Sequence, residues 1–213
     1  MHYLAIFIDF ILHLDIHLAA LVTTMGNWSY AILFLIIFVE TGLVITPLLP
    51  GDSLLFVAGS LASISTLNVH FLLFSLIIAA ILGNTTNYAI GVWLGPKVFH
   101  FPKSRWFNPI YLQKAHLFYE KFGGRAILLA RFIPIIRTFA PFVAGIARMP
   151  WGRFQLFNVI GSLAWVVIII YLGYFFGNVP AIKNNFSLVI IAIIIISIIP
   201  PIIEFINQKR KKY

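Results

Sequence analysis

Long apolar stretches follow one another along this chain, and they constrain its fold more than any other feature. A transmembrane helix needs about 20 predominantly apolar residues, and complete spans are predicted at residues 69–95, 154–177 and 186–206. Only 10% of the residues are charged and the mean hydropathy is +0.99, whereas soluble domains are about a quarter charged. We therefore predict a single all-α membrane domain over residues 1–213. An ordinary cytosolic enzyme, a disordered chain and a secreted disulfide module are excluded.

Two further apolar stretches, residues 28–63 and 126–148, are interrupted by residues that break helices. The interruptions are prolines and glycines, with Pro47, Pro50 and Gly51 in the first stretch and Pro134, Pro141 and Gly145 in the second. Lipid cannot satisfy the backbone groups that such breaks expose, so broken backbone at membrane depth must be buried in protein or line a wet cavity. We therefore predict two re-entrant helical hairpins that are shaped by these residues.

The basic residues are confined to one part of the chain and indicate its orientation. Residues 1–96 contain neither Lys nor Arg, while residues 96–125 and 207–213 are rich in both. Cytoplasmic loops of membrane proteins carry an excess of Lys and Arg, so the 96–125 loop and the C-terminal tail are predicted to be cytoplasmic. Because spans 154–177 and 186–206 lie between them, the second hairpin opens to the cytoplasm and the first to the opposite side. A pI near 10 would suggest nucleic-acid binding in a soluble protein, but this distribution predicts no nucleic-acid partner.

The N-terminal residues 1–27 differ from the complete spans. His2, Asp9, His13 and His17 fall close to one face of a helix, since residues about four and seven apart are near whole turns. The pattern predicts an interfacial amphipathic helix, or a helix with a polar side turned into the protein.

A weak internal repeat relates the two hairpins. Pro47 lies 87 residues before Pro134, and Gly59 lies 86 residues before Gly145. The helix that follows each hairpin ends in Gly-x-x-x-Gly. Two hairpins of opposite orientation, each followed by a transmembrane helix, would form an inverted repeat. Inverted repeats with helices broken at mid-membrane are typical of transporters.

Four ionisable residues lie inside the two hairpins: Glu40 and Asp52 in the first, and Arg131 and Arg137 in the second. An ionised side chain at the bilayer centre costs about 2.5–3.5 kcal/mol on insertion scales. Contact between the acidic and the basic hairpin would balance these charges, so we predict that the hairpins meet. Buried ion pairs can have a purely structural role, but ionisable residues at this depth are functional candidates by default.

In the functional interpretation the acids and the bases have different roles. Glu40 and Asp52 are candidates for taking up and releasing a proton, and Asp52 has an alternative role as a helix N-cap after Gly51. Arg131 and Arg137 stay protonated, and a guanidinium group binds phosphate bidentately. The second hairpin is therefore a candidate site for a lipid phosphate.

Motifs of soluble enzymes and of metal sites are missing from the sequence. It contains no Cys. It also lacks the phosphate-binding Gly-rich loop of nucleotide-binding proteins, the Gly-x-Ser-x-Gly of hydrolases and the His-Glu-x-x-His of metalloproteases. His13 and His17 have a spacing that could bind a metal, but no third ligand is close in the sequence. We therefore expect no enzymatic activity, no metal and no cofactor.

The chain resembles the DedA family of membrane proteins, which is related to the SNARE-associated Golgi (VTT-domain) proteins. The resemblance rests on Glu40-Thr41-Gly42, on Pro47-Leu48-Leu49-Pro50-Gly51-Asp52-Ser53, and on the run ARFIPIIRTFAPFVAG that contains Arg131 and Arg137. It implies two facing re-entrant hairpins and lipid translocation that is driven or gated by protons, with undecaprenyl phosphate or a phospholipid as cargo. By motif, Glu40 and Asp52 match the family's essential acids, and Arg131 and Arg137 match its essential arginines. Gly83-Asn84 departs from the Gly-Asp that the family often has, which removes an acid from the middle span.

We therefore predict a multi-pass protein of a bacterial inner membrane that transports undecaprenyl phosphate or a related phospholipid in a proton-coupled manner. Membrane lipids and protons are the expected partners, and self-association into a homo-oligomer is left open. Two other functions fit the same residues. A proton/cation antiporter that maintains membrane potential would need Glu40 and Asp52 but no lipid. A non-transporting membrane scaffold would use the charged residues only as ion pairs.

Overall fold

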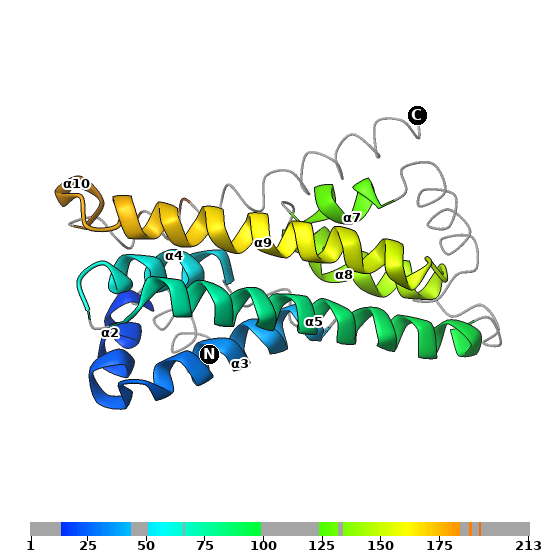
Figure 1. The fold of residues 1–213 in the computed structure, drawn as a ribbon, viewed down its shortest axis with the longest axis horizontal. Helices are drawn as coiled ribbons and strands as arrows, with labels where there is room; N and C mark the ends of the chain where they lie inside the picture. The colour runs from blue at the N-terminus through cyan, green and yellow to red at the C-terminus, as the bar shows by residue number, and fades with distance from the viewer. Residues whose placement is uncertain are drawn as a thin grey trace, which may run out of the picture. The chain divides into compact units, whose positions relative to one another are not determined.

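A computed structural model of the chain describes residues 14–43, 51–65, 67–98, 124–131 and 134–183, together with residues 188 and 192. These residues form helices and turns and contain no strand, which confirms the predicted all-helical class. The helices in Figure 1 are α2 (Leu14–Met25), α3 (Trp28–Gly42), α4 (Gly51–Ala62), α5 (Val69–Val98), α7 (Arg125–Ala130), α8 (Pro134–Ile146), α9 (Trp151–Phe176) and α10 (Pro180–Lys183).

Several predicted elements lie outside the described residues. They are the start of the N-terminal helix, the turn that contains Pro47 and Pro50, most of the basic 96–125 loop, nearly all of the 186–206 span and the 207–213 tail. The predictions made for these segments stay predictions.

The described helices belong to two compact units, and each unit is described by itself. Unit 1 consists of Met1–Ile36, Leu48–Ile77 and Ala164–Tyr213, and unit 2 consists of Ile37–Pro47 and Ile78–Leu163. Helices α3, α5 and α9 each contribute residues to both units.

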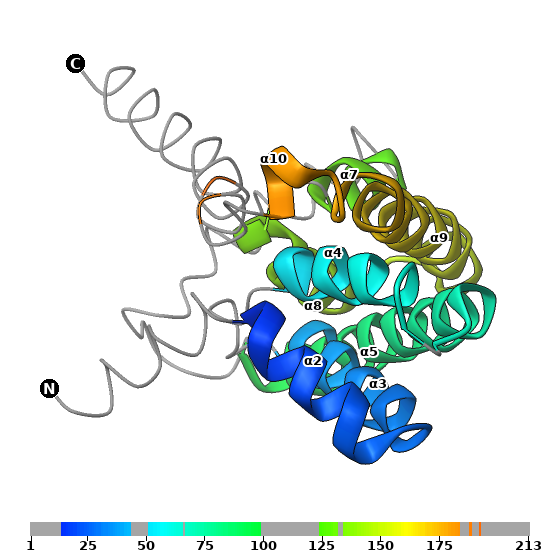
Figure 2. The same cartoon turned by 90° about the vertical axis from the view of Figure 1, so that its left-hand side faces the viewer.

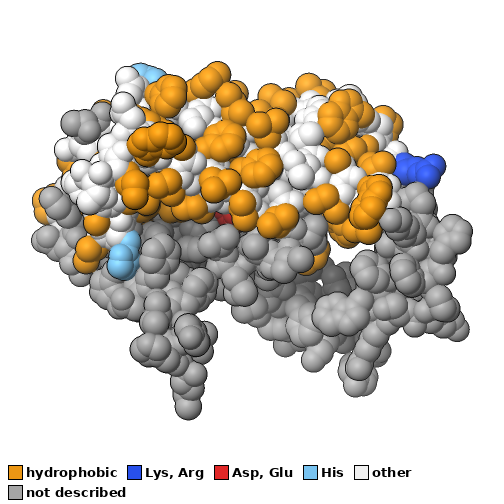
Figure 3. Space-filling view, turned by 90° about the horizontal axis from the view of Figure 1, so that it is seen from below, with side chains coloured by type: hydrophobic (Ala, Val, Ile, Leu, Met, Phe, Trp, Pro, Cys, Tyr) orange, Lys and Arg blue, Asp and Glu red, His pale blue; other side chains and the backbone are white. Residues whose placement is uncertain are grey.

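Two of the described helices are long and apolar enough to cross a membrane. They are the Val69–Gly95 part of α5 and Trp151–Phe176, which is the whole of α9, and both match predicted spans closely. Large apolar side chains such as Leu156, Leu163 and Phe175 are exposed on α9. The face of the described residues in Figure 3 is covered mainly by hydrophobic side chains, with a Lys or Arg side chain at one end. Extended apolar surface of this kind is typical of proteins that contact lipid.

The first predicted hairpin contains two described helices. α3 ends at Gly42 and α4 begins at Gly51, and the prediction that Pro47 and Pro50 break the helix falls on residues outside the described ranges. Nearly every residue of α4 is buried, as expected for a short apolar helix that is enclosed by protein. In unit 1, α2 lies against α4 (Figure 2) and buries its own Leu18 and Val22.

The second predicted hairpin also contains two described helices. α7 ends at Ala130 and α8 begins at Pro134, and the start of α8 fits the preference of proline for the first position of a helix. The prediction that Pro141 and Gly145 also break the hairpin is wrong, because both lie inside α8. Pro141 cannot donate the helical hydrogen bond to residue 137, but membrane helices tolerate prolines where neighbouring side chains satisfy the freed backbone groups.

Glycines allow two pairs of helices to pack with their backbones in close contact. In unit 2, a methyl group on Gly91 of α5 would overlap the carbonyl oxygen of Phe142 on α8, and one on Gly145 of α8 would overlap the carbonyl oxygen of Tyr88 on α5. Gly145 is therefore needed as a small residue at a helix contact, which is the common role of glycine between membrane helices.

Unit 1 contains an equivalent contact between α4 and α9. A methyl group on Gly59 of α4 would overlap the carbonyl oxygen of Ile170, and one on Gly173 of α9 would overlap the carbonyl oxygen of Phe56. The same sequence offsets relate the residues of both contacts. Phe56 lies 86 residues before Phe142, as Gly59 does before Gly145. Tyr88 lies 82 residues before Ile170, as Gly91 does before Gly173.

We predict that alanine at Gly91 or Gly145 destabilises the protein. The added methyl group meets backbone rather than a movable side chain, and overpacking of this kind costs about 1–3 kcal/mol. Thermal unfolding of the purified protein in detergent would measure the effect.

Gly152 provides the matched control, because a methyl group there would meet no atom within 4 Å. Gly152→Ala should leave the unfolding temperature unchanged or raise it slightly, since alanine is the better helix former. Equal unfolding temperatures for all three variants would contradict the close approach of α5 and α8.

Candidate functional site

Glu40 and Arg137 form a buried ion pair in unit 2. Nη2 of Arg137 lies 2.7 Å from Oε1 of Glu40, and the two residues are 5% and 1% exposed. Glu40 is carried by the last turns of α3 and Arg137 by the first turns of α8. An acid of the first hairpin therefore contacts a base of the second, as the sequence predicts.

Arg131 is buried in the same unit, directly after α7. Its Nη1 donates a hydrogen bond of 3.4 Å to Oδ1 of Asn158 on α9, and it is close enough to Arg137 and Glu40 to interact with both electrostatically. The Arg131 stem passes Gly161 of α9, where a methyl group would lie 3.1 Å from the Arg131 Cδ. The absence of a side chain at Gly161 thus leaves space for the arginine.

Asp52 belongs to unit 1 and has a different kind of partner. Its Oδ1 accepts a hydrogen bond of 2.8 Å from Nε1 of Trp165 on α9, and Trp165 is buried. Asp52 lies in the first turn of α4, where a carboxylate is favoured by the helix dipole. Of the predicted site residues, unit 2 brings together Glu40, Arg131 and Arg137, while Asp52 contacts Trp165 in unit 1.

Asparagine side chains of the two long helices were not among the sequence candidates, yet they are central to unit 2. Asn84 and Asn87 of α5 and Asn158 of α9 are buried. A signal for them was present in the sequence, because three amides inside apolar spans are costly unless they are hydrogen-bonded. Asn84 and Asn87 are also about one helical turn apart and so share a face of α5.

Asn158 is the centre of a hydrogen-bond network between α5 and α9. Its Oδ1 accepts from Nδ2 of Asn84 at 2.9 Å and from Oγ of Ser162 at 3.3 Å, in addition to Arg131. Its Nδ2 donates to the carbonyl oxygen of Ile81 at 3.1 Å. Both ends of the amide are therefore used, as expected for a buried polar group.

Asn87 contacts the backbone of both α3 and α8. Its Nδ2 donates to the carbonyl oxygen of Thr41 at 3.1 Å and to that of Thr138 at 2.9 Å. Thr41 follows Glu40 at the end of α3, and Thr138 follows Arg137 on α8. One side chain of α5 thus joins the two segments that carry the ion pair.

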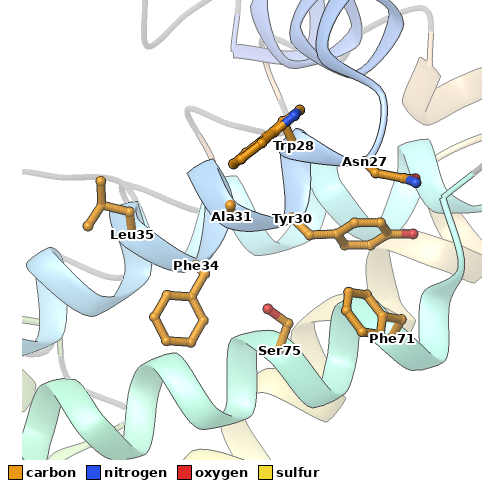
Figure 4. A pocket seen from close by; sticks show the side chains of 8 residues that line it. All are labelled: Asn27, Trp28, Tyr30, Ala31, Phe34, Leu35, Phe71 and Ser75. Carbon is orange, nitrogen blue, oxygen red and sulfur yellow. The ribbon is translucent and has the colours of Figure 1, made fainter.

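Unit 1 contains an apolar pocket of about 620 Å³, shown in Figure 4. Its walls come from the start of α3 and the start of α5: Asn27, Trp28, Tyr30, Ala31, Phe34, Leu35, Phe71 and Ser75. The rings of Tyr30 and Phe71 meet edge to face, with their centroids 4.7 Å apart. No ionisable residue predicted for the site lines this pocket, so its chemistry suits a hydrocarbon chain.

The described residues contain no group of three His, Asp or Glu side chains arranged to hold a metal ion. The polar atoms gathered in unit 2 are guanidinium, carboxylate, amide and hydroxyl groups. Such a set can bind an anion through the guanidinium groups and exchange a proton at the carboxylate.

Comparison with known proteins agrees with this membrane architecture. Residues 49–175 match the model of the VTT domain. The chain is 58% identical to Protein DedA of Escherichia coli strain K12, over 95% of this chain and 94% of that protein. It is 42% identical to an uncharacterized membrane protein of Mycobacterium leprae, over 79% of this chain and 75% of that protein. It is 37% identical to inner membrane protein YqjA of Escherichia coli strain K12, over 74% of this chain and 71% of that protein. No solved structure matches the chain.

We predict that Glu40→Gln lowers the stability by about 3–5 kcal/mol, because it leaves the buried Arg137 charge without its carboxylate. The double variant Glu40→Leu with Arg137→Met should recover most of the loss, since apolar residues of similar volume can replace a buried pair. Thermal unfolding in detergent would measure both effects.

Arg153→Gln, at an exposed arginine of α9, is the control and should change the unfolding temperature little. An unaltered unfolding temperature in Glu40→Gln would contradict the importance of the pair.

Proposed function

We propose that this chain, which belongs to the DedA family of VTT-domain membrane proteins, transports a lipid phosphate across a bacterial inner membrane in exchange with, or together with, protons. The observation that carries the proposal is the gathering of Arg131, Arg137 and Glu40 in the buried part of unit 2. Undecaprenyl phosphate and phospholipids are the candidate cargoes. The protein would have several spans and a cytoplasmic C-terminus.

The charges in unit 2 favour an anionic ligand. Arg131 and Arg137 place two guanidinium groups in the buried part of unit 2, with the Glu40 carboxylate beside Arg137. Guanidinium groups bind phosphate oxygens bidentately, and a phosphate would offset the cost of holding two cations away from water. The hydrocarbon chain of the cargo would lie along apolar protein surface, of which the pocket between α3 and α5 in unit 1 is one example.

Glu40 links proton binding to phosphate binding in this proposal. When the carboxylate is ionised, it holds the Arg137 guanidinium at 2.7 Å. Protonation of Glu40 removes that attraction and releases the guanidinium for phosphate. By thermodynamic linkage, the bound phosphate then favours the protonated carboxylate to the same extent. Asp52, which Trp165 holds in unit 1, is a second candidate for proton exchange.

Two re-entrant hairpins in an inverted repeat are also part of this proposal. Its support is that Gly59 and Gly173 in unit 1 make the same backbone contacts as Gly145 and Gly91 in unit 2, at matching sequence offsets. An inverted repeat provides two related conformations that open to opposite sides of the membrane, as alternating access requires.

We predict that Arg131→Ala and Arg137→Ala each reduce the translocation of labelled undecaprenyl phosphate in proteoliposomes by about tenfold or more, because each removes a charged hydrogen-bond donor for the phosphate. Arg153→Ala, at an exposed position, is the matched control and should transport normally. Wild-type rates in both buried-arginine variants would contradict the phosphate role.

A charge exchange separates transport from a scaffold function. Glu40→Arg with Arg137→Glu keeps an ion pair between the same helices, so a scaffold should keep its function in cells. A transporter should lose it, since the phosphate-binding group moves to the wrong hairpin. Normal envelope maintenance by this double variant would therefore favour the scaffold.

Proton/cation antiport is the second candidate function, favoured by the hydrogen bond from Trp165 that fixes a second acid, Asp52, within unit 1. An antiporter would change the internal pH of vesicles in response to Na⁺ or K⁺, even when prenyl phosphate is absent. We expect no such response from the wild-type protein. A cation-dependent pH change that is abolished by Asp52→Asn and left intact by Arg131→Ala would show that the protein is an antiporter rather than a lipid transporter.

A further inference from the structure

Two asparagines of α5 contact the partners of the charged residues in unit 2: Asn84 contacts Asn158, and Asn87 contacts the backbone beside Glu40 and Arg137. Asn84 and Asn87 are 2% and 0% exposed and lie about one turn apart on the helix. Each acts through its amide nitrogen. Among the described residues, the amide oxygens Oδ1 of Asn84 and Asn87 accept no hydrogen bond. Both asparagines therefore make these contacts as hydrogen-bond donors.

Asn87 donates to two backbone carbonyl groups, one on α3 and one on α8. Thr41 is in the last turn of α3, where carbonyl groups have no partner within the helix. Thr138 follows Arg137 in the first turns of α8. The two hydrogens of Nδ2 can serve both carbonyl oxygens at once. The distance between the Glu40 and Arg137 segments therefore depends on Asn87.

Asn84 acts on Arg131 through Asn158. The orientation of the Asn158 amide follows from two partners of unambiguous polarity: the Ile81 carbonyl can only accept, and the Arg131 guanidinium can only donate. Oδ1 of Asn158 therefore faces Arg131, and Asn84 must donate to that same oxygen. An ionised Asp at position 84 would place a carboxylate oxygen against Oδ1 of Asn158. The two oxygens would repel each other, which would disturb the contact between Asn158 and Arg131.

We propose that Asn84 and Asn87 are positioning residues for the transport site: one orients Arg131 through Asn158, and the other holds the Glu40 and Arg137 segments at a set distance. This inference rests on the lipid-phosphate transport proposed above. It assigns to α5 the function of a rigid support that presents two uncharged amide donors, one to Asn158 of α9 and one to the backbone of α3 and α8. A phosphate that bridges both guanidinium groups requires their spacing to be set before it binds.

The test uses substitutions that change polarity and preserve size. Asn84→Asp and Asn87→Asp are nearly isosteric, but an ionised carboxylate cannot donate. In proteoliposomes with fluorescently labelled undecaprenyl phosphate, each variant should raise the KM about tenfold or more, as expected when a hydrogen bond that orders a charged group is lost. Asn87→Gln retains both donors and should recover part of the wild-type KM.

Thr86 of the same turn supplies the matched control. Its hydroxyl donates only to Leu82 of its own helix among the described contacts, so Thr86→Val should leave KM and kcat unchanged. If an Asp variant fails to fold, Asn84→Ser or Asn87→Ser replaces it, because serine keeps one donor and should give an intermediate KM.

The outcomes separate the two proposals. If wild-type protein does not move the labelled lipid, lipid-phosphate transport itself fails. If wild-type protein transports and folded Asp variants have the wild-type KM, the positioning role is wrong. A lower unfolding temperature with unchanged KM and kcat would likewise assign these asparagines to stability alone and overturn the inference.

Discussion

The buried ion pair between Glu40 and Arg137 is the interaction on which the architecture of unit 2 depends. Two charges withdrawn from water are stable only when they are paired and further hydrogen-bonded. The pair joins the end of α3 to α8, so it can form only if both helices end or begin at the right depth. The break between α7 and α8 and the end of α3 at Gly42 satisfy that condition.

Broken helices create a second requirement, because their free carbonyl groups also need partners. Asn87 provides one for Thr41 at the end of α3 and also donates to Thr138 within α8, while Asn158 links α9 to α5 and to Arg131. The polar contacts of unit 2 thus centre on two asparagines, Asn87 and Asn158. Glycines at 91 and 145 let the backbones of α5 and α8 approach closely enough for these short side chains to reach.

The amide at position 84 gives the departure from the family's common Gly-Asp a physical meaning. In this chain the residue donates to Asn158, which a carboxylate could do only when protonated. The middle span therefore supplies hydrogen-bond donors to Asn158 and to the backbone beside Glu40 and Arg137, and the acids of the candidate site belong to the first predicted hairpin. Proton exchange in the proposed mechanism consequently falls to Glu40 and Asp52.

The sequence by itself determined the helical membrane class, the two long helices and the residues of interest in both hairpins, because these follow from hydropathy, proline and buried charge. It also indicated that acid and base would meet, since unpaired charges in an apolar segment are costly. Only the tertiary structure decided that Arg137 forms an ion pair with Glu40, and that Asp52 binds Trp165. It also decided that Pro141 lies inside α8. These outcomes depend on side chains far apart in the chain, whose distances no local pattern of residues contains.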